Sequence, residues 1–162
     1  MTTSVILYSI MLAVFFGYIL FIVAKYGIQK SVSQSFYVLP KNINFLFTLF
    51  CWGFVLPAMI LSENGLMFFG GAGIGFVGAA AAYKGNKMAN SVHMIGAYVG
   101  ILLSQLSIFF NFNLPYVNIA FFSLILLIFL ISRLIKMKTL IWWIEMVAFL
   151  AIVYAIGVAK VF

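Results

Sequence analysis

Three ionisable side chains are the ones most able to do chemistry in this chain: the single histidine, His93, and the two acids, Glu63 and Glu145. Glu145 lies in the apolar run TLIWWIEMVAFL, six residues after Thr139. A helix rises ~1.5 Å per residue, so this carboxylate is expected ~9 Å inside an apolar layer. A carboxylate at that depth is costly and indicates a functional site with a specific partner. Glu63 lies in the turn SENG and is expected to be solvated.

The candidate partners of Glu145 come from a basic loop and the segment that follows it. Lys84 and Lys87 lie shortly before His93, and both His93 and Glu145 stand near the start of an apolar run. If both runs are helices that enter a membrane from the same side, the four side chains share a level. Two interpretations of this candidate interior polar site stay open. It is a proton- or ion-linked site in which His93 titrates near neutral pH, or it is a fixed polar contact that sets helix register.

The chain lacks the catalytic or cofactor-binding residues that most enzyme classes require. One histidine, one cysteine (Cys51) and no aspartate do not supply the three ligands of a catalytic zinc. A Ser-His-Asp triad would need Glu145 in place of its aspartate. The chain has neither a Walker loop nor a dinucleotide fingerprint. These absences favour a non-enzymatic protein with no metal and no cofactor. The enzymatic alternative is an intramembrane hydrolase that acts on lipid through a serine near His93.

The composition is typical of a membrane protein. Of the 162 residues, 67% are hydrophobic and 7% are charged, whereas roughly a quarter of the residues of a soluble domain are charged. Because a spanning helix needs about 20 apolar residues, the chain is long enough for about six spans with short loops. The formal charge of +7 is expected to set the topology and to meet anionic lipid headgroups, and no nucleic-acid partner is predicted.

Apolar runs separated by polar turns predict an all-α, polytopic membrane protein: a single six-helix transmembrane domain over residues 1–162. The expected spans are about 4–25, 43–62, 66–83, 91–110, 115–135 and 139–160. Within the longest loop, four apolar residues recur at helical spacing, with a lysine, two serines and a glutamine opposite them. The apolar four are Ile28, Val32, Phe36 and Leu39. This spacing fits a short interfacial helix at about 28–39, and an ordinary polar loop is the alternative.

The basic residues fall on alternate loops and so predict an orientation. Eight of the nine lysines and arginines lie in or beside the loops after the first, third and fifth spans. They are Lys25, Lys30, Lys41, Lys84, Lys87, Arg133, Lys136 and Lys138. Because basic loops stay in the cytoplasm, both termini are expected outside, in a bacterial cytoplasmic membrane.

Small residues indicate how the helices pack. Helices in lipid associate through small residues that let their backbones approach. The third span has Gly71, Gly75 and Gly78, and the fourth has Gly96 and Gly100 on the face of His93. We predict that these two stripes match in a close antiparallel hairpin. A glycine-lined substrate path is the alternative interpretation.

Three stretches resemble a known family when taken together: SVSQSFYVLPKNINFLFTLFCWGFVLPAMI, FFGGAGIGFVGAAAAYKGNKM and VHMIGAYVGI, over about residues 29–105. The chain is similar there to small, uncharacterised multi-span membrane proteins of gut-type bacteria and their tailed phages. The resemblance implies about six spans and no known activity. If the protein is phage-borne, modifying the host envelope or excluding rival phages would be a natural role.

Two functions remain open besides the lipid hydrolase. The first is a non-enzymatic membrane protein that acts by packing with itself, with other membrane proteins or with lipid. The second is a small transporter or channel with a proton- or ion-linked site at His93 and Glu145. An interior cavity that reaches both residues would favour the second function, and a dry bundle would favour the first.

Overall fold

The computed structural model describes residues 3–161, which fold almost entirely into helices and contain no strand. The long helices are α1 (Thr3–Tyr26), α3 (Phe45–Ser62), α4 (Gly65–Ala79), α5 (Lys87–Phe110), α6 (Pro115–Ile135) and α7 (Leu140–Lys160). Two short elements lie between α1 and α3: the 3₁₀ turn η1 (Val32–Gln34) and the single-turn helix α2 (Ser35–Val38). The all-α prediction is confirmed.

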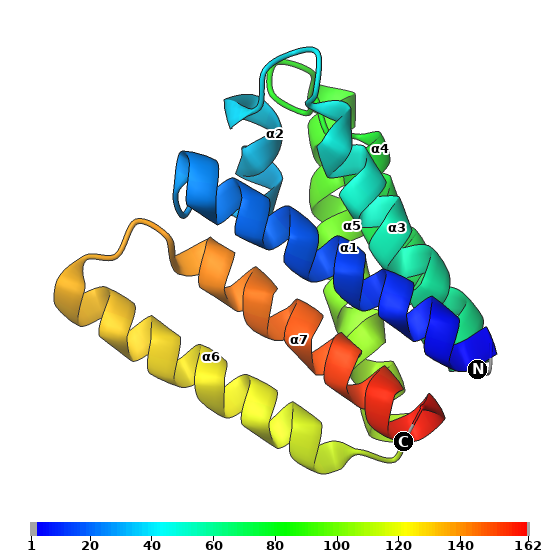
Figure 1. The fold of residues 1–162 in the computed structure, drawn as a ribbon. Helices are drawn as coiled ribbons and strands as arrows, with labels where there is room; N and C mark the ends of the chain where they lie inside the picture. The colour runs from blue at the N-terminus through cyan, green and yellow to red at the C-terminus, as the bar shows by residue number, and fades with distance from the viewer. Residues whose placement is uncertain (1–2, 162) are drawn as a thin grey trace.

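The long helices run in alternating directions, and the start of α1 lies at the same end of the molecule as the end of α7 (Figure 1). Five of these helices, all but α4, are long and apolar enough to cross a membrane. The exception, α4, is equally apolar but has only 15 residues. The chain thus has the architecture expected of a multi-pass membrane protein.

The core lies where α1, α3 and α7 meet. Phe15 of α1 and Phe149 of α7 both contact Phe54 of α3, with ring centroids 5.8 Å and 4.9 Å away. Phe50, one helical turn before Phe54, also contacts Phe149. The hairpin of α6 and α7 extends from this core, and α6 lies at the edge of the molecule (Figure 1). Only 17% of its most apolar stretch is buried, so α6 presents most of its surface outward.

The glycines bring α3, α4 and α5 into close contact, but in a different arrangement from the predicted one. Gly96 and Gly100 face α4, where a Cβ added at Gly73 would lie 2.8 Å from the Gly96 oxygen and from the Gly100 nitrogen. Gly71, Gly75 and Gly78 of α4, which were expected to pack against these two glycines, face α3 instead. A Cβ at Gly71 would meet Met59, one at Gly75 would meet Trp52, and one at Gly78 would meet Cys51. The glycine-rich helix α4 therefore packs closely on two sides.

The segment expected as a helix at about 28–39 is neither a regular helix nor an ordinary polar loop. Its η1 turn and α2 fold into one end of the bundle (Figure 1). Three alternate serines, Ser31, Ser33 and Ser35, are buried there, although the apolar spacing placed the first two on the polar side. Ser35 explains part of this burial, because its hydroxyl bonds to the Tyr18 hydroxyl of α1 at 2.5 Å. We call residues 30–38 the inserted segment.

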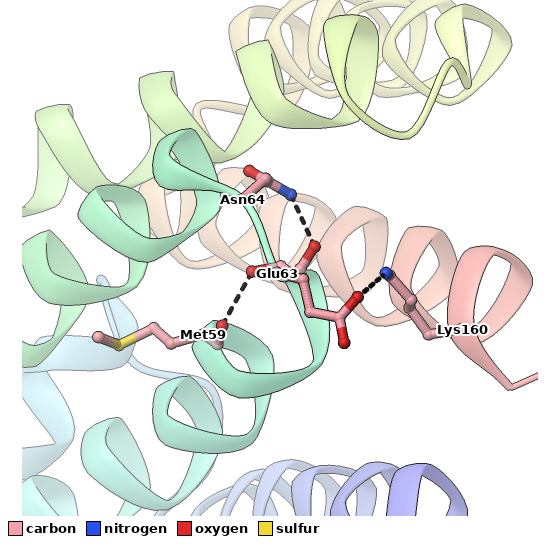
Figure 2. Close-up of polar contacts among 5 residues, drawn as sticks. Met59, Glu63, Asn64 and Lys160 are labelled. Carbon is pink, nitrogen blue, oxygen red and sulfur yellow. Dashed lines mark hydrogen bonds and ion pairs between the residues drawn. The ribbon is translucent and has the colours of Figure 1, made fainter.

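At the opposite end, an ion pair joins the turn after α3 to the end of α7. Glu63 ends α3 in a left-handed conformation (φ 53°), and its Oε2 accepts a hydrogen bond from Lys160 Nζ at 2.8 Å (Figure 2). That hydrogen bond, together with the lysine charge, lowers the pKa of the Glu63 carboxyl. Glu63 is exposed, as expected of a turn residue, but it is ion-paired rather than simply solvated.

Candidate functional site

Glu145 lies at the opposite end of α7 from Lys160, where the inserted segment meets the helix. Trp142 is buried one turn before it, and the Trp142 backbone nitrogen donates to the Lys30 carbonyl oxygen at 3.1 Å. The Val32 backbone nitrogen donates to Glu145 Oε2 at 2.5 Å. The start of α7 is therefore held to the inserted segment by two hydrogen bonds.

The backbone of the inserted segment explains why Glu145 finds a donor there. Ser31 caps the η1 turn, and its hydroxyl oxygen accepts from the Gln34 nitrogen at 3.2 Å. The first nitrogens of a helical turn have no partner within the turn itself. The Val32 nitrogen is one of these, and Glu145 supplies its acceptor. Within residues 3–161, Glu145 does not form the expected ion pair with His93, Lys84 or Lys87. The ion pair that these residues do contain is Lys160–Glu63.

His93 is buried, with 3% of its surface exposed, at the junction of α4 and α5. Its ring stacks on Tyr83 with centroids 4.0 Å apart, and it lies against the backbone carbonyls of Val77 and Ala80. Its Nδ1 atom forms no hydrogen bond within the described part of the chain. His93 thus keeps an unsatisfied polar atom, which is uncommon for a buried side chain.

The two lysines predicted at this level have different surroundings. Lys84 Nζ donates to Gln34 Oε1 at 2.6 Å, and the amide of the same glutamine donates to the Tyr83 hydroxyl at 2.8 Å. Lys84 therefore links the α4–α5 loop to the inserted segment. Burial is the main reason why the pKa of Tyr83 is raised. Lys87 begins α5, is exposed, and does not line the cleft described next.

A cleft of about 350 Å³ lies between α5, α7 and the inserted segment, and both His93 and Glu145 line it. We call it the α5–α7 cleft. One part of its lining is polar and comes from the inserted segment and the α4–α5 loop: Lys30, Ser31, Ser33, Gln34 and Tyr83. The remainder is mostly apolar and comes from α5 and α7: Met94, Ala97, Tyr98, Ile101, Ile141 and Ile144. The sequence thus identified two residues of one cleft, although they do not bond to each other.

A smaller inner cavity of about 40 Å³ lies next to this cleft. The two spaces share four lining residues, Ser33, Ala97, Ile101 and Glu145. Cys51 and the rings of Phe47, Phe50 and Phe149 also line the cavity. A space of this size holds a few water molecules or one small group. Glu145 therefore lines both the α5–α7 cleft and the aromatic cavity.

The sequence did not identify the inserted segment or the aromatic wall as parts of the site. The serines at alternate positions 31, 33 and 35 were the available signal for the segment. No group of three or more possible metal ligands occurs among the described residues. Comparisons with family models, curated proteins and solved structures found no match.

Proposed function

We propose that this protein is a small membrane carrier whose α5–α7 cleft contains a proton-linked binding site at Glu145. The observation that carries the proposal is that Glu145 and His93 line one cleft, and that this cleft shares four lining residues, Glu145 among them, with a neighbouring cavity. This is the feature that favours a transporter over a protein acting through helix packing alone. Glu145 is the group that takes up and releases the proton or the ligand. His93 lines the same cleft, and its Nδ1 atom has no hydrogen-bond partner among residues 3–161.

The proposal includes an orientation in the membrane. We propose that α4 is a sixth, short span and that the ends bearing the inserted segment and the basic loops face the cytoplasm. The charge distribution supports this orientation, since eight of the nine basic residues lie at that end and basic loops stay inside. In a bacterial cytoplasmic membrane the same residues would contact anionic lipid headgroups.

Proton movement in proteoliposomes tests the function. Vesicles that contain a trapped pH-sensitive dye, the protein and valinomycin are exposed to an external acid pulse. We expect wild-type protein to acidify the interior faster than protein-free vesicles do. Glu145→Gln should reduce the protein-dependent rate at least about tenfold, since it removes the carboxylate that takes the proton.

Glu63→Gln is the matched control, because it changes the chain's other acid, which lies at the far end of α7. It should leave the rate unchanged. Equal rates for wild type and Glu145→Gln would contradict the proposal. A folded bundle without proton movement would instead favour a protein that acts through packing, for which the exposed surface of α6 is available.

A further inference from the structure

Building on the proposed function, we infer that the ligand of the α5–α7 cleft is an amphiphilic organic cation. Its positively charged ammonium group lies against Glu145 and the aromatic wall of the inner cavity, and its apolar body lies along α5 and α7. The inference rests on the charge around Glu145, on the chemistry of the inner cavity, and on the shape and exposure of the cleft.

The charge of Glu145 is not balanced by a basic side chain within the described residues. Glu145 is bonded to a neutral backbone donor, the Val32 nitrogen, and no lysine, arginine or histidine within residues 3–161 forms an ion pair with it. A carboxylate in an apolar span that lacks a charged partner is strongly disfavoured unless a cation or a proton neutralises it. Among the described residues, one of its two oxygens, Oε2, accepts a hydrogen bond. The other oxygen is left for a positively charged ligand.

Calcium and magnesium do not fit as that ligand, because the cavity offers too few oxygens. Calcium takes six to eight oxygen ligands, and magnesium requires near-octahedral oxygen coordination. Around the inner cavity the lining side chains offer oxygens only from Glu145 and Ser33, and the rest of the lining is apolar apart from a cysteine. A weakly hydrated organic ammonium group does not need such a shell of oxygens.

The inner cavity offers aromatic rings beside the carboxylate instead of a shell of oxygens. Phe47, Phe50 and Phe149 line it beside Glu145. Phe50 and Phe149 hold each other in place, with ring centroids 5.6 Å apart. Aromatic faces attract ammonium groups, and more strongly where water is excluded. A carboxylate beside several aromatic rings is therefore suited to a quaternary or tertiary ammonium group.

The part of the cleft that α5 and α7 line suits an apolar ligand body. Several apolar residues that line the cleft are also open to the surroundings of the bundle: Met94 is 39% exposed, Tyr98 67% and Ile141 51%. Apolar residues at this level of a spanning helix face lipid. A ligand with an apolar body could thus enter sideways from the bilayer, where amphiphilic cations accumulate, and turn its charged group inward to Glu145.

Binding of benzyltrimethylammonium to the full chain in nanodiscs tests the inference, with isothermal titration calorimetry as the measurement. Phenylmethanesulfonate, of similar shape but opposite charge, is the control compound. We expect saturable binding of the ammonium compound and none of the sulfonate. Glu145→Gln should weaken binding at least about tenfold, and Phe149→Leu should weaken it about threefold. Glu63→Gln should bind as wild type does.

Two further variants keep the test decisive if Glu145→Gln does not fold. Glu145→Asp keeps the charge but shortens the side chain, and should bind the ammonium compound more weakly than wild type. Ala97→Leu adds bulk where the cleft meets the inner cavity and should block binding without changing any charge. Absence of ammonium binding to wild type, equal binding of the sulfonate, or full binding to Ala97→Leu would overturn the inference. If proton movement still depends on Glu145 in that case, the proposed function stands and only the ligand class is wrong.

Discussion

The two acids of this chain show how the surroundings of a carboxylate follow from its depth. Glu63 lies in an exposed turn and pairs with Lys160, an arrangement in which water still solvates both groups. Glu145 lies within an apolar helix, and its partner is a backbone nitrogen of a segment folded into the bundle. The inserted segment thus supplies a hydrogen bond that the apolar side chains around Glu145 do not offer.

The hydroxyl of Ser35 provides a test of how strongly the inserted segment is held. Ser35 Oγ donates to the Val32 carbonyl, so the Tyr18 hydroxyl must donate to Ser35 Oγ. Ser35→Ala would leave the buried Tyr18 hydroxyl without its acceptor. We expect a loss of about 1–3 kcal/mol in the free energy of unfolding. Denaturant titration in mixed micelles, followed by circular dichroism, measures it.

The control for Ser35→Ala is Ser9→Ala, since Ser9 is exposed and bonds only to its own helix. The control should change stability by less than about 0.5 kcal/mol. The double variant Tyr18→Phe/Ser35→Ala should lose less than the two single changes added together, because it removes both hydroxyl groups. Additive losses would show that the two hydroxyls are not coupled.

The sequence located His93 and Glu145 in one site but not the partner of Glu145, for a physical reason. Apolar periodicity indicates the depth and the face of a side chain, which were enough to bring both residues to one cleft. The partner is a backbone N–H group, which every residue except proline carries. Its availability depends on the local η1 turn and on the burial of Ser31 and Ser33. No side-chain pattern records that conformation.

At the scale of the elements, α4 shows how far a glycine pattern can be interpreted. A repeat of small residues predicts close approach, and α4 does approach its neighbours closely. The repeat does not say which neighbour lies on which face. Gly71 faces α3, whereas Gly73, two positions on, faces α5. With glycines on both sides of one helix, the sequence alone leaves the pairing open.

Because α4 and α5 pack so closely, adding a single methyl group between them is expected to lower the stability of the protein markedly. A Cβ at Gly73 would lie 2.8 Å from two backbone atoms of α5, which have no side-chain freedom to move away. We expect Gly73→Ala to separate the helices and to reduce the free energy of unfolding by about 1–3 kcal/mol. Gly17→Ala is the control, because nothing lies within 4 Å of a Cβ there. The same micelle titration compares them, and equal stability of the two variants would refute the close packing.

At the scale of the whole molecule, the charge distribution and the helix order support each other. The helices alternate in direction, so the loops after α1, α4 and α6 lie at one end together with the inserted segment (Figure 1). The α5–α7 cleft lies at this end, because residues of the inserted segment line it. The same end carries eight of the nine basic residues, and the opposite end carries the Glu63–Lys160 ion pair. With the basic end inside, the cleft faces the cytoplasmic leaflet.

The two ends of α5 test this orientation directly. α5 has 24 residues, and at ~1.5 Å per residue it is ~36 Å long, enough to cross a hydrocarbon core about 30 Å thick. Met88 in its first turn and Asn111 at its end are both exposed. Each is replaced in turn by cysteine in a Cys51→Ser background, and intact cells are treated with a membrane-impermeant maleimide.

We expect Asn111→Cys to react in intact cells and Met88→Cys to react only after permeabilisation, because the positive-inside rule keeps the basic loop before α5 in the cytoplasm. Neither substitution changes the charge of the chain, so the rule itself is undisturbed. The reverse labelling pattern would place the cleft in the outer leaflet, and the amphiphilic cation would then enter from outside. Labelling of both ends in intact cells would mean that α5 does not cross the membrane, and the cleft could not belong to a carrier.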